Sequence, residues 1–499
     1  MKRQNIQNYI KEKNFFYFFL FNFFLHLISI NFFPTNFEGT FSEYGNFFNQ
    51  DDKVKYVLNY YSGQFNTFIF SLLISMLYFV FPFFDTLHYA HFLSALSYFF
   101  WIYGMKNFLN FFKIDKVIIF LIILNPLIFY YGFRIYSDFL AFSLAFYAIS
   151  GILNNKKNYL YLFLYSISIL LKPQNLIFIF IFYFLFFNKL TIKNLITYNI
   201  YLILPFFFLI FTNYKFFNFF LVPNINSNDV AIKGFAEMLS NFIFYIGYLG
   251  IICFPIGLSY LSINYKKKFF ILILLFSFFI GLFLSLFMSA FDSELSIGVF
   301  KNFIHPKFYD FAICFVAILT LSMIFDQIIK KNELKYLVIV FHIFCYMLIL
   351  SFIKISPKYL IIVVPFYYIL FSDIVIRKIY SNFLSLLAGI IITFLLLFNY
   401  YQVGYSAEKI FQFLNEKKIF HMTRIDPIVP HIYHLVNMDF FQDEYHIKGK
   451  PILSNLGEKI IYEVVYANQY NLEQNTHYVD NRKMFGFEIN KFKIIKINE

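Results

Sequence analysis

Carboxylates gather in the first long polar segment of this chain, between two strongly apolar runs. The segment carries Glu43, then Asp51 and Asp52, followed by Tyr56 and Gly63. Carboxylates held against a substrate can move protons as general acids or bases. A single loop carboxylate, however, more often does no more than favour water. This segment therefore becomes a candidate site only if other polar groups lie on the same side of the molecule.

A second polar group lies at the boundary between the next pair of apolar runs. The stretch after Asn125 and Pro126 contains Arg134, Tyr136 and Asp138. Ionisable residues next to apolar spans are costly to bury, and they are usually functional or paired with each other. The alternative is a structural ion pair, because Arg134 and Asp138 are four residues apart and would share one face of a helix.

Two lysines stand apart from the other basic residues. Lys172 precedes Pro173, and Lys358 follows Pro357 and precedes Tyr359. Cations beside helix starts that begin with proline suit an anionic ligand. The alternative is that each lysine reaches toward lipid headgroups while its stem stays in the apolar layer.

The elements that must position these residues are membrane spans. The chain is 60% hydrophobic and only 14% charged, whereas a soluble domain carries about a quarter charged residues. Crossing a bilayer takes roughly 20 apolar residues in a helix. Suitable runs lie at 14–33, 88–105, 117–133, 136–154, 158–173, 174–188, 195–212, 236–262, 269–290, 307–326, 336–353, 359–376 and 381–400.

Basic residues give these runs an orientation, since cytoplasmic loops are enriched in Lys and Arg. They recur at every second connection: Lys2/Arg3/Lys11/Lys13, Lys106/Lys113/Lys116, Lys156/Lys157, Lys189/Lys193, Lys266–Lys268, Lys330/Lys331/Lys335 and Arg377/Lys378. The regularity requires that a further apolar run, 65–83, does not cross. We therefore expect 65–83 to be an in-plane helix within the first outer loop, 34–87. The N-terminus is then cytoplasmic, and all the candidate residues face outward.

The chain is expected to divide at residue 400. Residues 1–400 form the membrane domain, while 401–499 hold 12 Lys/Arg and 12 Asp/Glu and mix polar with apolar residues. The predicted fold is an all-α polytopic membrane protein of about 13 transmembrane helices, with a small C-terminal α/β domain outside the cytoplasm. The formal charge of +13 belongs to the loops of the membrane domain, so it does not indicate nucleic-acid binding. The three cysteines lie in apolar runs and show no disulfide or zinc spacing.

The order and sidedness of these residues resemble the GT-C superfamily of polyprenyl-phosphate-sugar-dependent glycosyltransferases, particularly bacterial mannosyltransferase-like and aminoarabinose-transferase-like members. Asp52, Tyr56 and Gly63 match the spacing of that family's acidic first outer loop. The second outer loop and the later lysines match as well, with Pro126, Arg134 and Asp138, then Lys172, then Lys358-Tyr359 before Pro365. The chain departs from the pattern in two places: Gln50-Asp51-Asp52 replaces the usual Asp-Glu, and Lys358 replaces an Arg.

The resemblance implies an inverting hexosyl- or pentosyltransferase of the bacterial inner membrane. Its donor would be a polyprenyl-phosphate sugar, and its acceptor a glycan, lipid or protein of the cell envelope. Asp52 would be the general base, with Asp51 and Glu43 as alternatives, and Asp138 would orient the acceptor or share a divalent metal such as Mg²⁺ or Mn²⁺ with Asp52. Contacts to the substrate would come from Glu43, Tyr56, Arg134, Tyr136, Lys172, Lys358 and Tyr359.

Two other classes of membrane protein remain as alternatives. An O-antigen polymerase or ligase is also polytopic, but its large outer loop tends to come late and to be rich in Arg and His, whereas the long outer loop here comes early and is acidic. A transporter or flippase for a lipid-linked substrate often shows internal repeats, and this sequence shows no convincing repeat. Both classes are less favoured than the glycosyltransferase.

Overall fold

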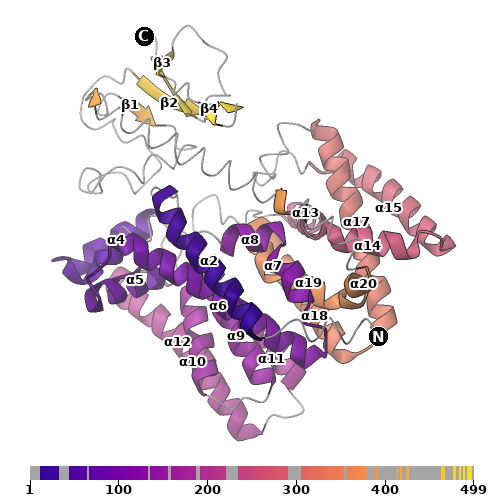
Figure 1. Cartoon of the computed structure of the whole chain (residues 1–499), viewed down its shortest axis with the longest axis horizontal. Coiled ribbons are helices and arrows are strands. Elements are labelled where there is room, and N and C mark those ends of the chain that lie inside the picture. Colours follow the sequence, from indigo (N-terminus) through magenta and orange to yellow (C-terminus); the bar gives the residue numbers. More distant parts are fainter. Residues whose placement is uncertain are drawn as a thin grey trace. The chain divides into compact units, whose positions relative to one another are not determined.

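The computed structural model is mainly α-helical, with short strands toward the C-terminus (Figure 1). It describes residues 12–32, 44–63, 67–132, 135–154, 159–186, 191–220, 234–289, 305–352 and 357–378, and short pieces within 387–496. The chain divides into two compact units. The first comprises residues 1–22, 95–215 and 219–393, and the second comprises 23–94, 216–218 and 394–499.

Helices account for most of the described residues of both units. In the first half of the chain these are α2 (Glu12–Phe32), η2 (Tyr44–Asn49), α4 (Lys53–Gly63), α5 (Ile69–Val80), α6 (Thr86–Phe112), α7 (Ile118–Ile123), α8 (Pro126–Gly132), α9 (Ser137–Leu153), α10 (Tyr159–Leu171), η3 (Pro173–Ile177), α11 (Phe178–Phe186) and α12 (Ile192–Phe217). In the second half they are α13 (Phe235–Ile252), α14 (Phe254–Asn264), α15 (Lys268–Phe287), α17 (Pro306–Lys331), α18 (Leu334–Ser351), η6 (Pro357–Ile362), α19 (Val364–Leu370) and α20 (Ser372–Arg377).

Five helices among the described residues are long and apolar enough to cross a membrane. They are Ile196–Phe217 within α12, α13, Phe270–Phe287 within α15, α17 and α18. A sixth span would be the pair α8 and α9, which bends by 110° between its two parts. The expectation of a multi-pass helical membrane protein is thus confirmed. The figure of 13 crossings stays a prediction, and most of the run at 381–400 lies outside the described residues.

Prolines explain why several apolar runs are not single helices. Proline lacks the N–H of a helical bond and disfavours helical geometry in the residue before it. The run 117–133 breaks into α7 and α8 at Pro126, and 236–262 breaks into α13 and α14 next to Pro255. The run 359–376 becomes η6, α19 and α20, with Pro365 in the first turn of α19. An apolar run therefore predicts burial in lipid or protein better than it predicts one continuous helix.

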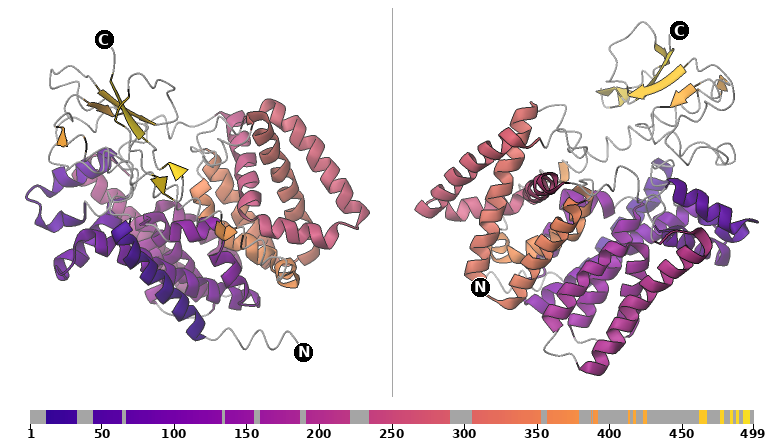
Figure 2. Two further views of the ribbon diagram at one scale, coloured as in Figure 1. Left: turned by 45° about the horizontal axis from the view of Figure 1, so that its top comes forward. Right: turned by 180° about the vertical axis from the view of Figure 1, so that it is seen from behind.

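Close helix contacts hold the later half of the first unit together. Helix α17 packs against both α13 and α15, and the three lie side by side (Figure 2). Glycines allow the approach: a Cβ added at Gly247 would lie 2.6 Å from the Ile313 carbonyl oxygen, and one at Gly281 would lie 2.7 Å from the Phe315 Cα. Helix α11 packs on α18 and so joins this group to the neighbouring pair α9 and α10.

A tight connection joins α17 to α18. Helix α17 ends at Lys331 and α18 begins at Leu334, so only Asn332 and Glu333 lie between them. Asn332 is left-handed, with φ 35° and ψ 34°, and its N–H donates to the Ile328 carbonyl. Asparagine is one of the few residues that adopt this conformation readily. The two helices therefore form a hairpin with a two-residue turn.

The basic clusters converge at one end of the first unit. The Lys331 Nζ lies 3.3 Å from the Asp373 carboxylate of α20, and the Lys335 Nζ lies 5.9 Å from the centroid of the Phe112 ring at the end of α6. The Asn154 side chain, just after α9, donates to the Asn107 carbonyl of α6 at 2.8 Å. We call this the lysine end of the first unit. The starts of α9 and η6 mark the opposite end.

The second unit contains the first polar segment of the chain. The short helix η2 packs against both α4 and α5. Helix α5, within the apolar run 65–83, has 12 residues, which is about 18 Å at 1.5 Å per residue against a hydrocarbon core of about 30 Å. The expectation that 65–83 is an in-plane helix that does not cross stays a prediction.

The strands lie in residues 423–496 and form two small sheets. They are β1 (Thr423–Ile425), β2 (Tyr462–Tyr466), β3 (Thr476–Tyr478), β4 (Lys483–Met484), β5 (Phe487–Glu488) and β6 (Phe492–Lys496). The larger sheet has the order β1-β2-β6-β3, with β1 parallel to β2 and the other pairs antiparallel. Strand β4 pairs with β5. A C-terminal α/β domain spanning 401–499 stays a prediction, as do the domain boundaries at 400 and 401.

Candidate functional site

The centre of the candidate site is an ion pair between Asp138 and Lys172. The Lys172 Nζ lies 2.8 Å from the Asp138 carboxylate, and the two side chains are only 11% and 12% exposed. Taking two charges out of water is costly, and the cost is offset only when the charges meet with good geometry. Because this pair is so well buried, keeping both charges here lowers the stability of the fold, which makes the pair a candidate for a functional role.

Asp138 is positioned by the start of α9. It lies in the first turn of the helix, where the positive end of the helix dipole favours an anion. Tyr136 is extended, with φ −146° and ψ 109°. Because α9 begins only at Ser137, the helical spacing of four residues expected between Arg134 and Asp138 does not apply. Among the described residues, the partner of Asp138 is Lys172, and the pairing with Arg134 stays a prediction. Arg134 itself lies outside the described residues.

Lys172 is held at the junction between α10 and η3. Its N–H donates to the Ser168 carbonyl at 3.0 Å, and its own carbonyl accepts from the Asn175 N–H at 3.0 Å. The Tyr165 hydroxyl donates to the Asn175 carbonyl at 2.8 Å. Pro173 begins η3 and prevents α10 from continuing. This buried set of bonds fixes the direction from which the lysine approaches Asp138.

Lys358 brings a second cation to the site from η6. Its Nζ lies 5.6 Å from the centre of the Tyr136 ring and 5.2 Å from that of Tyr359. Cations are attracted to aromatic faces at such distances. The charge of Lys358 also acts on the Asp138 carboxylate. Among the described residues of this cluster, two lysines thus approach one carboxylate.

Two residues of the surroundings were not singled out from the sequence. Tyr346 of α18 is buried, and the charge of Asp138 reaches its hydroxyl. Gln174 hydrogen-bonds with the side chain of Tyr359. Tyrosine is so abundant here, with 41 copies, that no pattern separates Tyr346 from packing residues. Gln174 could have been noticed because it directly follows Lys172-Pro173.

The structure brings together five of the residues expected at the site: Tyr136, Asp138, Lys172, Lys358 and Tyr359. Three separate helix breaks supply them, at the start of α9, after α10 and in η6. The sequence placed them on the same side of a membrane but did not predict which groups would pair. Their arrangement can attract an anion, because Lys358 and Lys172 approach one carboxylate from different elements.

The candidate carboxylates of the first polar segment belong to the second unit. Asp52 is exposed, and its carboxylate accepts the Lys55 N–H at 2.9 Å. It is therefore the N-cap of α4. Asp51 is exposed beside it, while Tyr56 is half-buried with its ring 6.4 Å from that of Phe68. Glu43 lies outside the described residues.

The described donors do not suit a bound metal. Within the described ranges, no group of three or more His, Cys, Asp or Glu side chains could hold an ion. Asp138 is already paired with Lys172, and Asp52 caps a helix. A Mg²⁺ or Mn²⁺ shared by Asp52 and Asp138 stays a prediction, and no step below depends on one.

Searches against protein-family models, curated proteins and solved structures each found no match to this chain.

Proposed function

We propose that this protein transfers a sugar from a polyprenyl-phosphate-linked donor to an acceptor of the bacterial cell envelope. The observation that carries the proposal is the buried Asp138–Lys172 pair with Lys358 beside it. A donor of this class has one part that is anionic, its phosphate. Lysines that converge where several helices break offer that phosphate charge-assisted hydrogen bonds.

In the proposed reaction, the acceptor hydroxyl oxygen attacks the anomeric carbon of the donor sugar. The bond between that carbon and the phosphate oxygen breaks, and polyprenyl phosphate leaves with the electron pair. The hydroxyl proton passes to a carboxylate, for which Asp52 is the first candidate and Asp51 and Glu43 are the alternatives. General-base assistance of this kind contributes about 10²–10⁴-fold. One displacement inverts the configuration of the anomeric carbon.

Lys172 and Lys358 would stabilise the charge that develops on the leaving phosphate, which is an electrostatic contribution to catalysis. Asp138 would hold Lys172 in place before the donor arrives. When the phosphate binds, Lys172 can share its donors between Asp138 and the phosphate. Tyr136 and Tyr359 present their rings to Lys358 at 5.6 and 5.2 Å, so they limit the positions that its ammonium group adopts.

The arrangement of charge along the first unit supports an outward-facing site. Helix α9 begins beside Asp138 and ends next to the lysine end through Asn154. It has 17 residues, or about 25 Å of length. Because Lys- and Arg-rich loops stay in the cytoplasm, we propose that the lysine end is cytoplasmic. The ion pair then faces the outer side of the bacterial inner membrane, where lipid-linked sugars meet envelope acceptors.

The decisive experiment replaces Asp52 by Asn. Asparagine caps helices about as well as aspartate, so the variant keeps α4 while losing the base. The assay supplies the purified protein in lipid nanodiscs with radiolabelled polyprenyl-phosphate hexose or pentose and a crude envelope acceptor. We expect sugar transfer by Asp52→Asn to fall by about 10²-fold or more.

Asp85 provides the matched control, because it is also an exposed carboxylate of the second unit that caps a helix, accepting the His88 N–H at 2.9 Å. Asp85→Asn should transfer sugar at the wild-type rate. Full activity of Asp52→Asn would move the base to Asp51 or Glu43. Absence of sugar transfer by the wild-type protein with every donor tested would contradict the proposal itself.

One observation favours a second candidate, a transporter or flippase for a lipid-linked substrate. Transporters often build their sites from interrupted helices, and here α8 and α9 bend by 110° next to the ion pair. The two functions separate in sealed vesicles that contain a fluorescent polyprenyl-phosphate sugar. A transporter moves the label between leaflets without cleaving it, whereas a transferase releases polyprenyl phosphate.

A further inference from the structure

The lysine end of the first unit carries a dense positive charge that the proposed transfer reaction does not use. Its basic residues come from four separate stretches of the chain and outnumber the acidic residues beside them. The basic residues are Lys106, Lys113, Lys116, Lys266, Lys267, Lys268, Lys330, Lys331, Lys335, Arg377 and Lys378, and the acidic ones are Asp115, Asp326, Glu333 and Asp373. Ion pairs within the group therefore cannot neutralise it.

The side chains around these lysines place them at the level of lipid headgroups. Exposed apolar residues lie directly beside the charges on the same helices: Ile329 is 78% exposed next to Lys330, and Leu334 is 62% exposed next to Lys335. Such residues are stable in contact with acyl chains, whereas the neighbouring ammonium groups require a polar environment. The boundary between hydrocarbon and headgroups therefore falls within about one helical turn of Lys330.

Aromatic rings line the same boundary. The Lys330 Nζ lies 5.6 Å from the centre of the Tyr260 ring, and the Lys331 Nζ lies 4.1 Å from that of Tyr336. The Lys266 Nζ lies 5.5 Å from the Tyr265 ring. Tyrosine is enriched at membrane interfaces because its ring is apolar and its hydroxyl is polar. Pairing with these rings holds the lysine stems in place and leaves ammonium protons for other acceptors.

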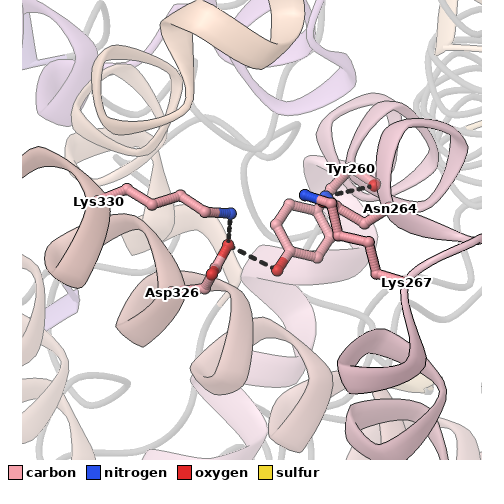
Figure 3. Close-up of polar contacts among 5 residues, drawn as sticks. All are labelled: Tyr260, Asn264, Lys267, Asp326 and Lys330. Atoms are coloured by element: carbon pink, nitrogen blue, oxygen red, sulfur yellow. Dashed lines mark hydrogen bonds and ion pairs between the residues drawn. The ribbon is translucent and has the colours of Figure 1, made fainter.

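Figure 3 shows the part of this surface where α14 and α17 approach each other. The Tyr260 hydroxyl donates to the Asp326 carboxylate at 2.7 Å, and Lys330 pairs with the same carboxylate. The Lys267 Nζ donates to the Asn264 side-chain oxygen at 2.8 Å. The Asp326 carboxylate thus contacts Lys330 and Tyr260 of α14, and the exposed Lys266, Lys267 and Lys268 follow the end of the same helix α14. A phosphate bound at this surface could contact several ammonium groups, and only the Asp326 carboxylate would compete with it for Lys330.

We propose that the lysine end, and above all the group Lys266, Lys267 and Lys330, binds the headgroups of acidic phospholipids. The binding rests on charge complementarity and on the position of the group at headgroup level. Each lysine at a membrane surface strengthens attraction to anionic lipid by roughly fivefold. Asp326 opposes it, since it occupies Lys330 and repels phosphate. Bound acidic lipid would fix this end of α14 and α17 in the plane of the membrane.

The test measures phosphatidylglycerol bound to the full-length protein, counted by native mass spectrometry after transfer from mixed vesicles of phosphatidylglycerol and phosphatidylcholine. The variant Lys266→Gln/Lys267→Gln/Lys330→Gln should bind phosphatidylglycerol at least about tenfold more weakly. Lys307→Gln is the matched control, because Lys307 is an exposed lysine at the other end of α17. It should bind as the wild type does.

A variant with the opposite expected sign separates lipid binding from damage to the fold. Asp326→Asn frees Lys330 and removes the competing charge, so it should tighten phosphatidylglycerol binding by a few-fold. Inorganic phosphate at the same concentration should not displace the lipid. Equal binding by the triple variant and the wild type would overturn the proposal, and so would an equal loss in Lys307→Gln. Competition by free phosphate would overturn the assignment of the occupant as a lipid.

Discussion

The two ends of the first unit pair lysine with aspartate in opposite ways. At one end, Asp138 and Lys172 are 12% and 11% exposed, and each lies where a helix begins or ends. At the lysine end, each pair has one largely buried and one exposed member: Lys330 is 46% exposed beside Asp326 at 16%, and Asp373 is 63% exposed beside Lys331 at 8%. The residue types are the same, and only burial and backbone context differ.

This difference indicates how much each pair contributes to the free energy of unfolding. Exposed ion pairs contribute about 0–1 kcal/mol, because water and salt screen them. In a buried pair, loss of one partner leaves an uncompensated charge and costs about 3–5 kcal/mol. Loss of a lysine–aspartate pair should therefore change stability little at the lysine end, whereas loss of one partner of the Asp138–Lys172 pair should be strongly destabilising.

The largest expected effect comes from neutralising the buried carboxylate. Asp138→Asn leaves Lys172 charged and without its 2.8 Å partner, so it should lower the free energy of unfolding by about 3–5 kcal/mol. Thermal unfolding of the protein in detergent micelles measures this. The double variant Asp138→Asn/Lys172→Met should recover most of the loss and remain inactive in sugar transfer. Wild-type stability of the single variant would remove the contrast between the two ends.

A smaller effect is expected where the helices that join the two ends touch. Gly247→Ala places a Cβ 2.6 Å from the Ile313 carbonyl oxygen, which should cost about 1–3 kcal/mol as α13 and α17 move apart. Gly257→Ala on α14 is the control, because nothing lies within 4 Å of its added Cβ. Thermal unfolding compares the two. Equal melting temperatures would show that α13 and α17 accommodate the added methyl group without loss of stability.

Loss of the hydroxyl that positions Lys172 should have a moderate effect. Tyr165→Phe leaves the buried Asn175 carbonyl without its 2.8 Å donor, at a cost of about 1 kcal/mol. Donor binding should weaken more than stability falls, because the lysine loses its fixed direction. The readout is the KM for the donor measured beside the melting temperature. An unchanged KM would show that the η3 backbone alone positions Lys172.

The smallest effect is expected at the lysine end. Lys330→Gln removes a half-exposed lysine from Asp326, which keeps the Tyr260 hydroxyl as a donor, and should change the free energy of unfolding by less than about 1 kcal/mol. The change should shrink further in 1 M salt, where the Debye length is about 3 Å. Thermal unfolding at low and high salt measures both. A loss comparable with that of Asp138→Asn would contradict the distinction drawn from burial.

The sequence predicted much of this arrangement through its charges. The regular recurrence of lysine groups anticipated that Lys331, Lys335 and the end of α6 would meet, and the structure brings them together. It also anticipated that Asp138, Lys172 and Lys358 would share one side. Both inferences depend on the high free energy of a charge in an apolar layer. That energy constrains every helix of the unit in the same way.

What the sequence could not predict depends on local geometry. The sequence offered an Arg134–Asp138 pair only as an alternative and did not point to Lys172 as a partner of Asp138, because the extended backbone at Tyr136 and the break after α10 are not visible in the hydrophobic pattern. The capping role of Asp52 was missed because a loop carboxylate and an N-cap have the same composition. Continuous spans were expected where Pro126 and Pro365 interrupt the helices. Each of these features depends on local backbone geometry, which composition and hydrophobic pattern do not show.

The two-residue connection at Asn332 also bears on how the protein enters a membrane during synthesis. Helices α17 and α18 are each long enough to cross, and Lys330, Lys331 and Lys335 flank the turn between them. Carrying that charged turn through hydrocarbon would be costly. The two helices can instead insert together as one hairpin, with the turn kept on the side where it began. The left-handed Asn332 makes that hairpin possible with only two residues between the helices.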